Sequence, residues 1–156
     1  MNQFLSDHAV AFSLSLAGLG LVGALVLIRG VLSADSGNKR MGEIAQAIQE
    51  GASAYLHRQL LTVSAIAIIV FAGIWYLRDG MTAAGFVVGS ICSMAAGYIG
   101  MLVAVRANVR TAHAASKSSH RALQVAFNGG AVTGLLVVGL GLLSVGAFYL
   151  IVLRIS

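Results

Sequence analysis

The carboxylates that could bind a metal ion or carry a proton are few and scattered in this chain. The acidic residues are Asp7, Asp35, Glu43, Glu50 and Asp79. All of them lie outside the long apolar runs, whereas a proton relay or ion site in a membrane needs a buried ionisable group. A magnesium–phosphate site needs neighbouring carboxylates, and Glu43 and Glu50 are only two. These patterns therefore predict no catalytic, cofactor-binding or metal-binding residue in the chain.

A glycine pattern near the start of the chain looks like a dinucleotide-binding fingerprint. Gly18, Gly20 and Gly23 spell G-x-G-x-x-G, and Glu43 follows about 20 residues later. The fingerprint requires a strand, a tight turn and then a helix. Here the glycines lie inside an apolar run of membrane length, where a phosphate would have to enter hydrocarbon. Contacts between packed helices are the better explanation of these glycines.

The basic residues lie at the ends of apolar runs rather than in one stripe. The formal net charge is +5, but this distribution does not suggest a nucleic-acid partner. Between Arg106 and Arg121 the chain also carries His113 and His120. These histidines are seven residues apart, whereas metal-binding pairs on helices usually use a spacing of four. We expect both histidines to lie on a solvated surface.

The segment after Lys39 has the pattern of an amphipathic helix. Its apolar residues fall on one helix face: Ile44, Ile48, Ala52, Tyr55 and Leu56. Its polar residues fall mostly elsewhere: Glu43, Gln46, Glu50 and His57. These polar residues, with Gln49, could be read as a binding site, but a solvated helix face explains them better.

The composition predicts an integral membrane protein. Hydrophobic residues are 58% of the chain and charged residues only 10%, and the mean hydropathy is +0.91. A soluble domain carries roughly 25% charged residues. A helix needs ~20 apolar residues to cross the hydrocarbon core, and four such spans are predicted: about 9–28, 59–77, 84–105 and 130–153. We therefore predict an all-α, multi-pass protein with residues 1–156 in a single membrane domain.

The third predicted span has two rows of small residues. One row contains Gly85, Gly89, Ser93 and Gly97, and the other contains Ala96, Gly100 and Ala104. Rows of this kind let helix backbones approach closely in lipid. No proline or turn cluster interrupts the stretch 90–115, so one continuous helix should carry Arg106 and Arg110 out of the membrane. We expect the first row to face protein rather than lipid.

The distribution of Lys and Arg predicts the orientation in the membrane. The connections 29–58 and 106–121 contain eight basic residues, against Arg78 and Arg154 on the other side. Cytoplasmic loops carry an excess of Lys and Arg. Both long connections are therefore predicted to be cytoplasmic, with the N-terminus outside.

Three stretches resemble one known family, the membrane-integral, ion-pumping inorganic pyrophosphatases. The stretches 97–101 and 106–115, GYIGM and RANVRTAHAA, are similar to the third membrane helix of that family. The stretch 126–143, AFNGGAVTG followed by LLVVGLGLL, is similar to the fourth. The stretches KRMGEIA (39–45) and AIQEGASAYL (47–56) resemble its first cytoplasmic connection. The matches come in the family's order and cover roughly 39–143.

This resemblance implies that the chain is an N-terminal fragment with the first four membrane helices of a longer enzyme. The family forms homodimers with helices in two concentric rings. It hydrolyses magnesium pyrophosphate on the cytoplasmic side and pumps H⁺ or Na⁺, with K⁺ dependence in some members. Its catalytic residues begin on the fifth helix, so none can be transferred to this chain. Arg106, Asn108 and Arg110 match the family, and we interpret them as structural residues that anchor the helix end and pair with neighbouring segments.

Two functional alternatives remain at this point. The first is a set of outer-ring helices of a pyrophosphatase, whose partners are lipid, the remaining helices and a second copy of the enzyme. Such a chain would be inactive alone, and Mg²⁺ would bind to the complete enzyme only. The second is a non-enzymatic four-helix membrane subunit or scaffold.

Overall fold

The computed structural model describes residues 2–155 and the side chains of residues 8–154, and it contains four long helices with no strand in this range. The helices are α1 (Asn2–Ser33), α2 (Lys39–Leu77), α3 (Gly80–Ala115) and α4 (Ser119–Ile155). All four are long and apolar enough to cross a membrane. Each predicted span lies within one helix. The predicted all-α membrane fold is confirmed.

Short connections with polar caps separate the helices. Residues 34–38 join α1 to α2, where Asn38 Oδ1 accepts a hydrogen bond from the Met41 amide at 2.9 Å. At the other end of α2, Asp79 accepts from the amide and the hydroxyl of Thr82, both at 2.8 Å. Both side chains satisfy amides that the first helical turn leaves without partners. Within the basic segment 106–121, only residues 116–118 are non-helical. The helices α3 and α4 therefore extend beyond the predicted membrane spans into this segment.

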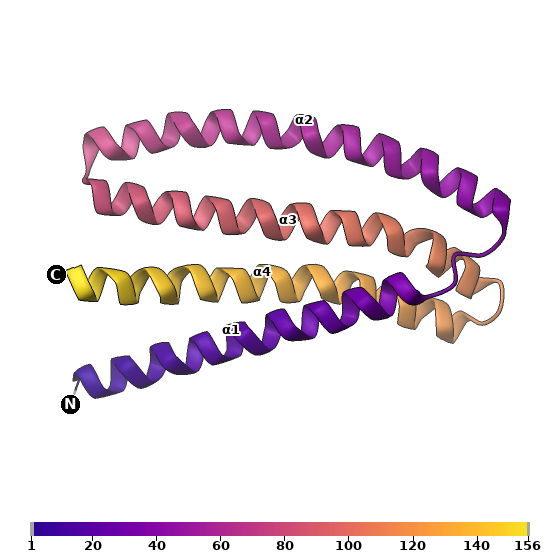
Figure 1. The fold of residues 1–156 in the computed structure, drawn as a ribbon, viewed down its shortest axis with the longest axis horizontal. Coiled ribbons are helices and arrows are strands. Elements are labelled where there is room, and N and C mark those ends of the chain that lie inside the picture. Colours follow the sequence, from indigo (N-terminus) through magenta and orange to yellow (C-terminus); the bar gives the residue numbers. More distant parts are fainter. Residues whose placement is uncertain (1, 156) are drawn as a thin grey trace.

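The four helices form one curved layer in the order α2, α3, α4, α1 (Figure 1). The last helix in the sequence, α4, therefore lies between α1 and α3. Both chain ends and the α2–α3 turn lie at one end of the layer, and the other two connections lie at the opposite end. We call this second end the connection end. α1 also contacts α3, whereas α1 and α2 do not touch within the described residues.

Small residues allow the close contacts of α4 with its two neighbours. A Cβ atom added to Gly139 would lie 2.9 Å from the Leu21 side chain, and one added to Gly129 would lie 2.9 Å from Ala107 Cβ. The buried core lies where α1, α3 and α4 meet: Ala24, Val31, Ala96, Val103, Ala107, Val132 and Leu136. Small-residue packing between helices, predicted from the sequence, is confirmed at these contacts.

Within this chain, the prediction that the first small-residue row of α3 faces protein holds at Gly85 and not at Gly89 or Gly97. Gly85 lies against the Phe148 ring, but added Cβ atoms at Gly89 and Gly97 would meet nothing within 4 Å. Ser93 and Gly97 are exposed. The second row, through Ala96 and Gly100, is the buried one, because α4 packs on that side of α3 and leaves Ser93 and Gly97 of the first row exposed.

Candidate functional site

The acidic residues at the connection end do not come together. Asp35 lies in the α1–α2 connection, and Glu50 accepts a hydrogen bond from Gln46 Nε2 on the same helix at 3.0 Å. Asp79 lies at the opposite end, and the Asp7 side chain is outside the described residues. Among the described residues, no three His, Cys, Asp or Glu side chains form a group that could hold a metal ion. The arrangement therefore does not provide the carboxylate cage of a magnesium–phosphate site.

The best-defined polar arrangement is built around Arg110 on α3. Its Nε donates to the Ala34 carbonyl at 3.0 Å, and one terminal nitrogen donates to the Leu32 carbonyl at 3.0 Å. Its other terminal nitrogen donates to the Arg106 carbonyl at 2.7 Å. The last carbonyl groups of a helix have no partner within it, so Arg110 caps the end of α1 from another helix. The guanidinium suits this role because its donors have a fixed, planar geometry.

A second set of contacts holds the same connection to the end of α3. Asp35 Oδ2 lies 3.1 Å from His113 Nε2 and 3.7 Å from Lys117 Nζ. The His113 Nε2 atom is buried, and its contact with Asp35 does not have the geometry of a hydrogen bond. The Gly37 amide, which donates to Asp35 at 2.9 Å, and the nearby His113 and Lys117 together lower the pKa of the Asp35 carboxyl below its ordinary value. Asp35 is therefore an anion at neutral pH.

Two further features of this connection depend on its residue types. Gly37 has φ of +87°, which L-residues other than glycine rarely adopt. An added Cβ there would also lie 2.9 Å from His113 Nδ1.

The expectation of a solvated His113 is wrong, since its side chain is only 18% exposed, whereas His120 is exposed as expected. The Asp35–His113 pair was missed because the two residues are far apart in the sequence.

The G-x-G-x-x-G pattern lies in the middle of α1, with no strand or turn around it. Added Cβ atoms at Gly20 and Gly23 would contact α4 at Leu135 or Gly139, whereas one at Gly18 would meet nothing within 4 Å. The pattern therefore serves helix packing at two of its three glycines, as predicted, and provides no phosphate-binding turn.

The predicted structural residues of α3 have three different environments. Arg110 pairs with a neighbouring segment, as predicted. Arg106 donates to the Leu102 carbonyl of its own helix at 3.1 Å. Asn108 is exposed and lines an apolar groove between α2 and α3. The contacts of Arg106 and Arg110 therefore lie at helix carbonyls, and those of Arg110 fasten α3 to the end of α1.

The comparison with protein families decides what kind of protein has this helix layer. The family model of the inorganic H⁺ pyrophosphatases matches residues 18–156. This match covers α2, α3 and α4 and the second half of α1. The chain belongs to the inorganic H⁺ pyrophosphatase family. The resemblance noted for 39–143 is thereby confirmed, and the chain is an integral membrane protein of a family of membrane pumps.

Relatives within this family are much longer than the chain. A K⁺-insensitive pyrophosphate-energized proton pump of Methanosarcina mazei is 51% identical over 143 residues, which cover 90% of this chain and 21% of the pump. A protein of the same name from Streptomyces coelicolor is 44% identical over 156 residues, 86% of this chain and 19% of its own length. A Clostridium tetani protein, provisionally named a K⁺-stimulated pyrophosphate-energized sodium pump, is 41% identical over 129 residues. The chain thus spans about a fifth of the length of these relatives.

Proposed function

We propose that this chain provides the N-terminal, outer-ring membrane helices of a pump that couples pyrophosphate hydrolysis to the transport of protons or sodium ions. The observation that carries the proposal is the 51% identity to the Methanosarcina mazei proton pump over 143 residues, nearly the whole helix layer. Identity at this level extends from α1 to α4 rather than being confined to one motif. The shared part of the pump is therefore the entire layer.

In this proposal the chain contributes structure rather than chemistry. Metal-assisted phosphoryl transfer needs carboxylates that hold the metal ion against the substrate, and the described residues do not assemble them. Binding of pyrophosphate and Mg²⁺ is assigned to parts of the pump outside these 156 residues. Homodimer formation is likewise assigned to the complete pump.

The proposed orientation places the connection end in the cytoplasm. Single cysteines at Gly42, Ser116 and Gly80, in a Cys92→Ala background, test it in intact cells with a membrane-impermeant thiol reagent. We expect labelling at position 80 only, because the basic residues gather at the other end. Labelling at positions 42 and 116 with position 80 protected would contradict this orientation.

The activity test compares this chain with a complete pump. The purified chain in liposomes should release no Mg²⁺-dependent phosphate from pyrophosphate above a preparation from cells without the gene. A chimera in which this chain replaces the matching segment of the Methanosarcina mazei pump should hydrolyse pyrophosphate and transport protons or sodium ions into vesicles. Hydrolysis by the 156-residue chain alone would refute the structural role. A folded chimera that hydrolyses nothing would favour the scaffold alternative.

A further inference from the structure

A charged cluster at the connection end joins the α1–α2 connection to the end of α3. Asp35 of the connection lies 3.1 Å from His113 Nε2 and 3.7 Å from Lys117 Nζ. Arg110 fastens the same connection to α3 through two backbone carbonyls. The Asp35–His113 contact differs from the Arg110 contacts, because an imidazole changes its charge between about pH 5 and 8 whereas a guanidinium does not.

The α1–α2 connection lies directly against the His113 ring. The His113 side chain is only 18% exposed, and its Nε2 atom is buried. Gly37, whose φ is +87°, lies at the other edge of the ring, where an added Cβ would come within 2.9 Å of Nδ1. A change in the charge of this imidazole therefore acts directly on the connection that covers it.

The contact between Nε2 and the carboxylate is better suited to a charged ring than to a neutral one. Among the described residues, His113 Nε2 has no hydrogen-bond partner, although Asp35 Oδ2 is 3.1 Å away. A neutral imidazole carries a hydrogen on only one ring nitrogen, whereas an imidazolium carries one on each. Protonation therefore ensures an N–H on Nε2 and adds a positive charge, and contacts between ionised groups are the stronger ones.

Asp35 keeps its negative charge over the range in which an imidazole titrates. The hydrogen bond from the Gly37 amide, followed by the charges of His113 and Lys117, lowers the pKa of the Asp35 carboxyl below its ordinary value. An ordinary aspartate has a pKa of about 3.9. Between about pH 5.5 and 8.5, a change in the strength of this pair therefore comes from the imidazole.

Positive groups on α3 and the burial of the ring act against protonation of His113. Lys117 is 52% exposed and contacts the same carboxylate oxygen, so water screens its charge. Arg110 directs its guanidinium to three backbone carbonyls, and Arg106 donates to the Leu102 carbonyl, one turn further from His113. The Asp35 carboxylate is in direct contact with the ring, and we expect its attraction to be larger than these opposing effects.

The other ionisable side chains near this end lie on α2 and α4. They are Lys39, Arg40 and Glu43 on α2, and His120 and Arg121 on α4, and all are exposed. Among the described residues, the ion pair of His113 is with Asp35 and with none of these five. Exposed charges are screened by water and salt more strongly than a contact across 3.1 Å.

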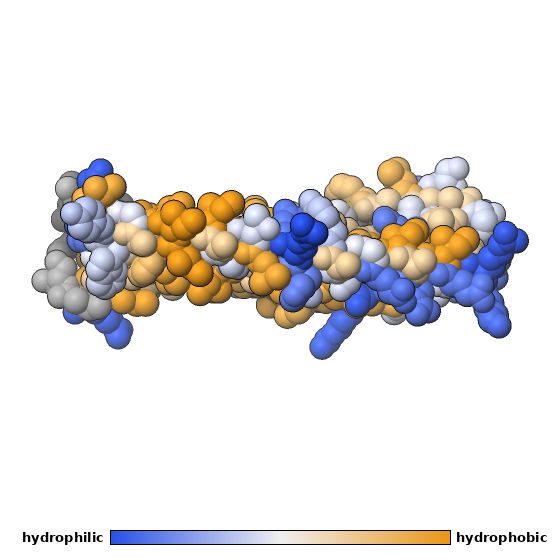
Figure 2. All heavy atoms as spheres, turned by 90° about the horizontal axis from the view of Figure 1, so that it is seen from above, coloured by the Kyte–Doolittle hydropathy of each residue, from blue (hydrophilic) through white to orange (hydrophobic). Residues whose placement is uncertain are grey.

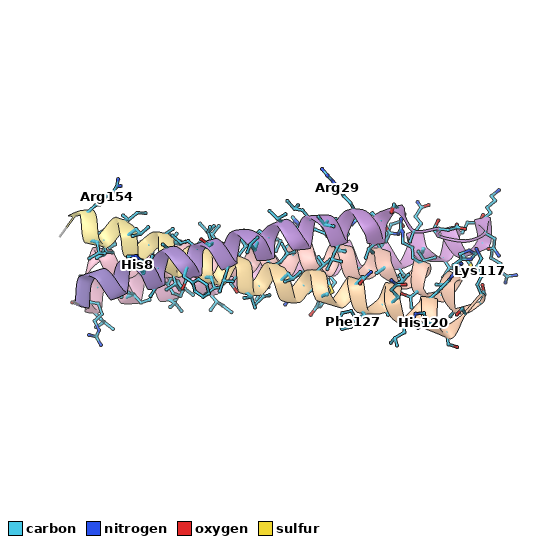
Figure 3. The ribbon with its side chains drawn as sticks, turned by 90° about the horizontal axis from the view of Figure 1, so that it is seen from below. His8, Arg29, Lys117, His120, Phe127 and Arg154 are labelled. Atoms are coloured by element: carbon cyan, nitrogen blue, oxygen red, sulfur yellow. The ribbon has the colours of Figure 1, made fainter. Side chains whose placement is uncertain are left out.

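The cluster lies outside the predicted membrane core, where protons reach it from water. Lys117 and His120 lie beyond Arg29 along the layer (Figure 3), and Arg29 directly follows the first predicted span. Figure 2 shows hydrophilic side chains projecting from the connection end. Asp35 itself is 67% exposed. In the proposed orientation, the water at this end is that of the cytoplasm.

We infer that Asp35 and His113 form a pH-sensitive latch, which closes the α1–α2 connection onto the end of α3 when the imidazole is protonated. The proton comes from water and returns to it. Because the closed contact favours the charged ring, its stabilising effect is present below about pH 6.5 and is lost as the pH rises through the range in which imidazoles titrate. Above this range, Arg110 still holds the connection. The inference goes beyond the proposed function and is tested on the chain alone.

Amide hydrogen exchange of the purified chain in detergent tests the latch. Peptides that cover residues 34–41 are followed by mass spectrometry between about pH 5.5 and 8.5, with each rate corrected for the intrinsic effect of pH. Protection of this segment should fall about two- to fivefold from the lower to the higher pH, as expected of a partly exposed ion pair. Peptides around Asp79, which caps α3 at the opposite end through Thr82, should keep the same protection.

Four variants assign the pH response. Asp35→Asn removes the charge but keeps an oxygen that accepts from the Gly37 amide, and His113→Gln removes the titrating ring. In both, protection should be the same at the two pH values and close to that of the unchanged chain at the higher pH. Lys117→Gln removes a second contact of the same carboxylate, and His120→Gln removes an exposed imidazole. Both of these control variants should keep the fall in protection.

Three results would overturn the latch. The first is equal protection at both pH values in the unchanged chain. The second is protection that rises with pH, which would show that burial and Lys117 outweigh Asp35. The third is a fall that persists in Asp35→Asn, which would assign the pH response to another group. If His113→Gln does not fold, Asp35→Asn decides the question alone, since it changes an exposed side chain. The chimera tests the proposed function separately.

Discussion

Replacing Gly100 with alanine should weaken the contact between α3 and α4. The added Cβ would lie 2.8 Å from Thr133 Oγ1, 2.9 Å from its Cγ2 and 3.1 Å from its Cβ. The Cβ of Thr133 is fixed by the backbone, so a change of rotamer cannot relieve the clash and the helices must move apart. Gly97 lies three residues earlier on the same helix and meets nothing within 4 Å. Gly97→Ala is therefore the matched control.

The expected difference between the two variants follows from this geometry. Each substitution gains about 1 kcal/mol of helix propensity, and this gain cancels in the comparison. Overpacking of a close contact costs about 1–3 kcal/mol. The folding equilibrium of Gly100→Ala should therefore lie about 5- to 150-fold below that of Gly97→Ala.

Unfolding of the purified chain by dodecyl sulfate in mixed micelles measures this difference. Dyes attached at Arg78→Cys and Arg154→Cys, with Cys92→Ala, report on the separation of the helix ends by energy transfer. Gly100→Ala should unfold at a clearly lower dodecyl sulfate fraction than Gly97→Ala. Coincident transitions would show that α3 and α4 do not pack through Gly100, and the packing argument would fail.

Three further predictions concern the α1–α2 connection. Arg110→Lys should cost about 1–3 kcal/mol, since Lys cannot replace both hydrogen bonds to the α1 carbonyls, and trypsin should then cleave faster after Lys39. Gly37→Ala should cost about 1–2 kcal/mol because of the positive φ, whereas Gly42→Ala, in open space on a helix, should not lower stability in the same dodecyl sulfate titration. The Asp35 pKa is lowered in the folded chain, so its stabilising effect is complete well above the ordinary Asp pKa of about 3.9 and is lost as the pH falls through that value toward the lower, folded pKa. Hydrogen exchange at the Gly37 amide, corrected for its intrinsic rate, should show this loss, and Asp35→Asn should remove the pH dependence.

The helices themselves could be predicted from the sequence because local patterns specify them. Apolar runs of membrane length gave the spans, and turn residues around Gly37 and Asn38 gave the first connection. The apolar pattern through Ile44 and Ile48 correctly marked one side of α2. These features depend on residues that are close together in the chain.

The contacts between helices could not be predicted in the same way. Gly97 and Gly100 are both glycines in small-residue rows, yet only Gly100 meets α4, because the choice depends on the direction from which α4 approaches. The contact of His113 with Asp35 joins residues of different helix ends, and no local pattern marks it. A row of small residues predicts that packing is possible, but not with which partner.

The position of α4 between α1 and α3 has a consequence for synthesis. α1 enters the membrane without its main neighbour, because α4 is made only after the whole of α2 and α3, 39 and 36 residues. At about 5–20 residues per second, α1 waits roughly 4–15 seconds. During this time its glycines and the carbonyls at its end lack the contacts described here. α1 must therefore be held in the membrane by its own hydrophobicity. The four-helix layer is complete only when α4 packs between α1 and α3.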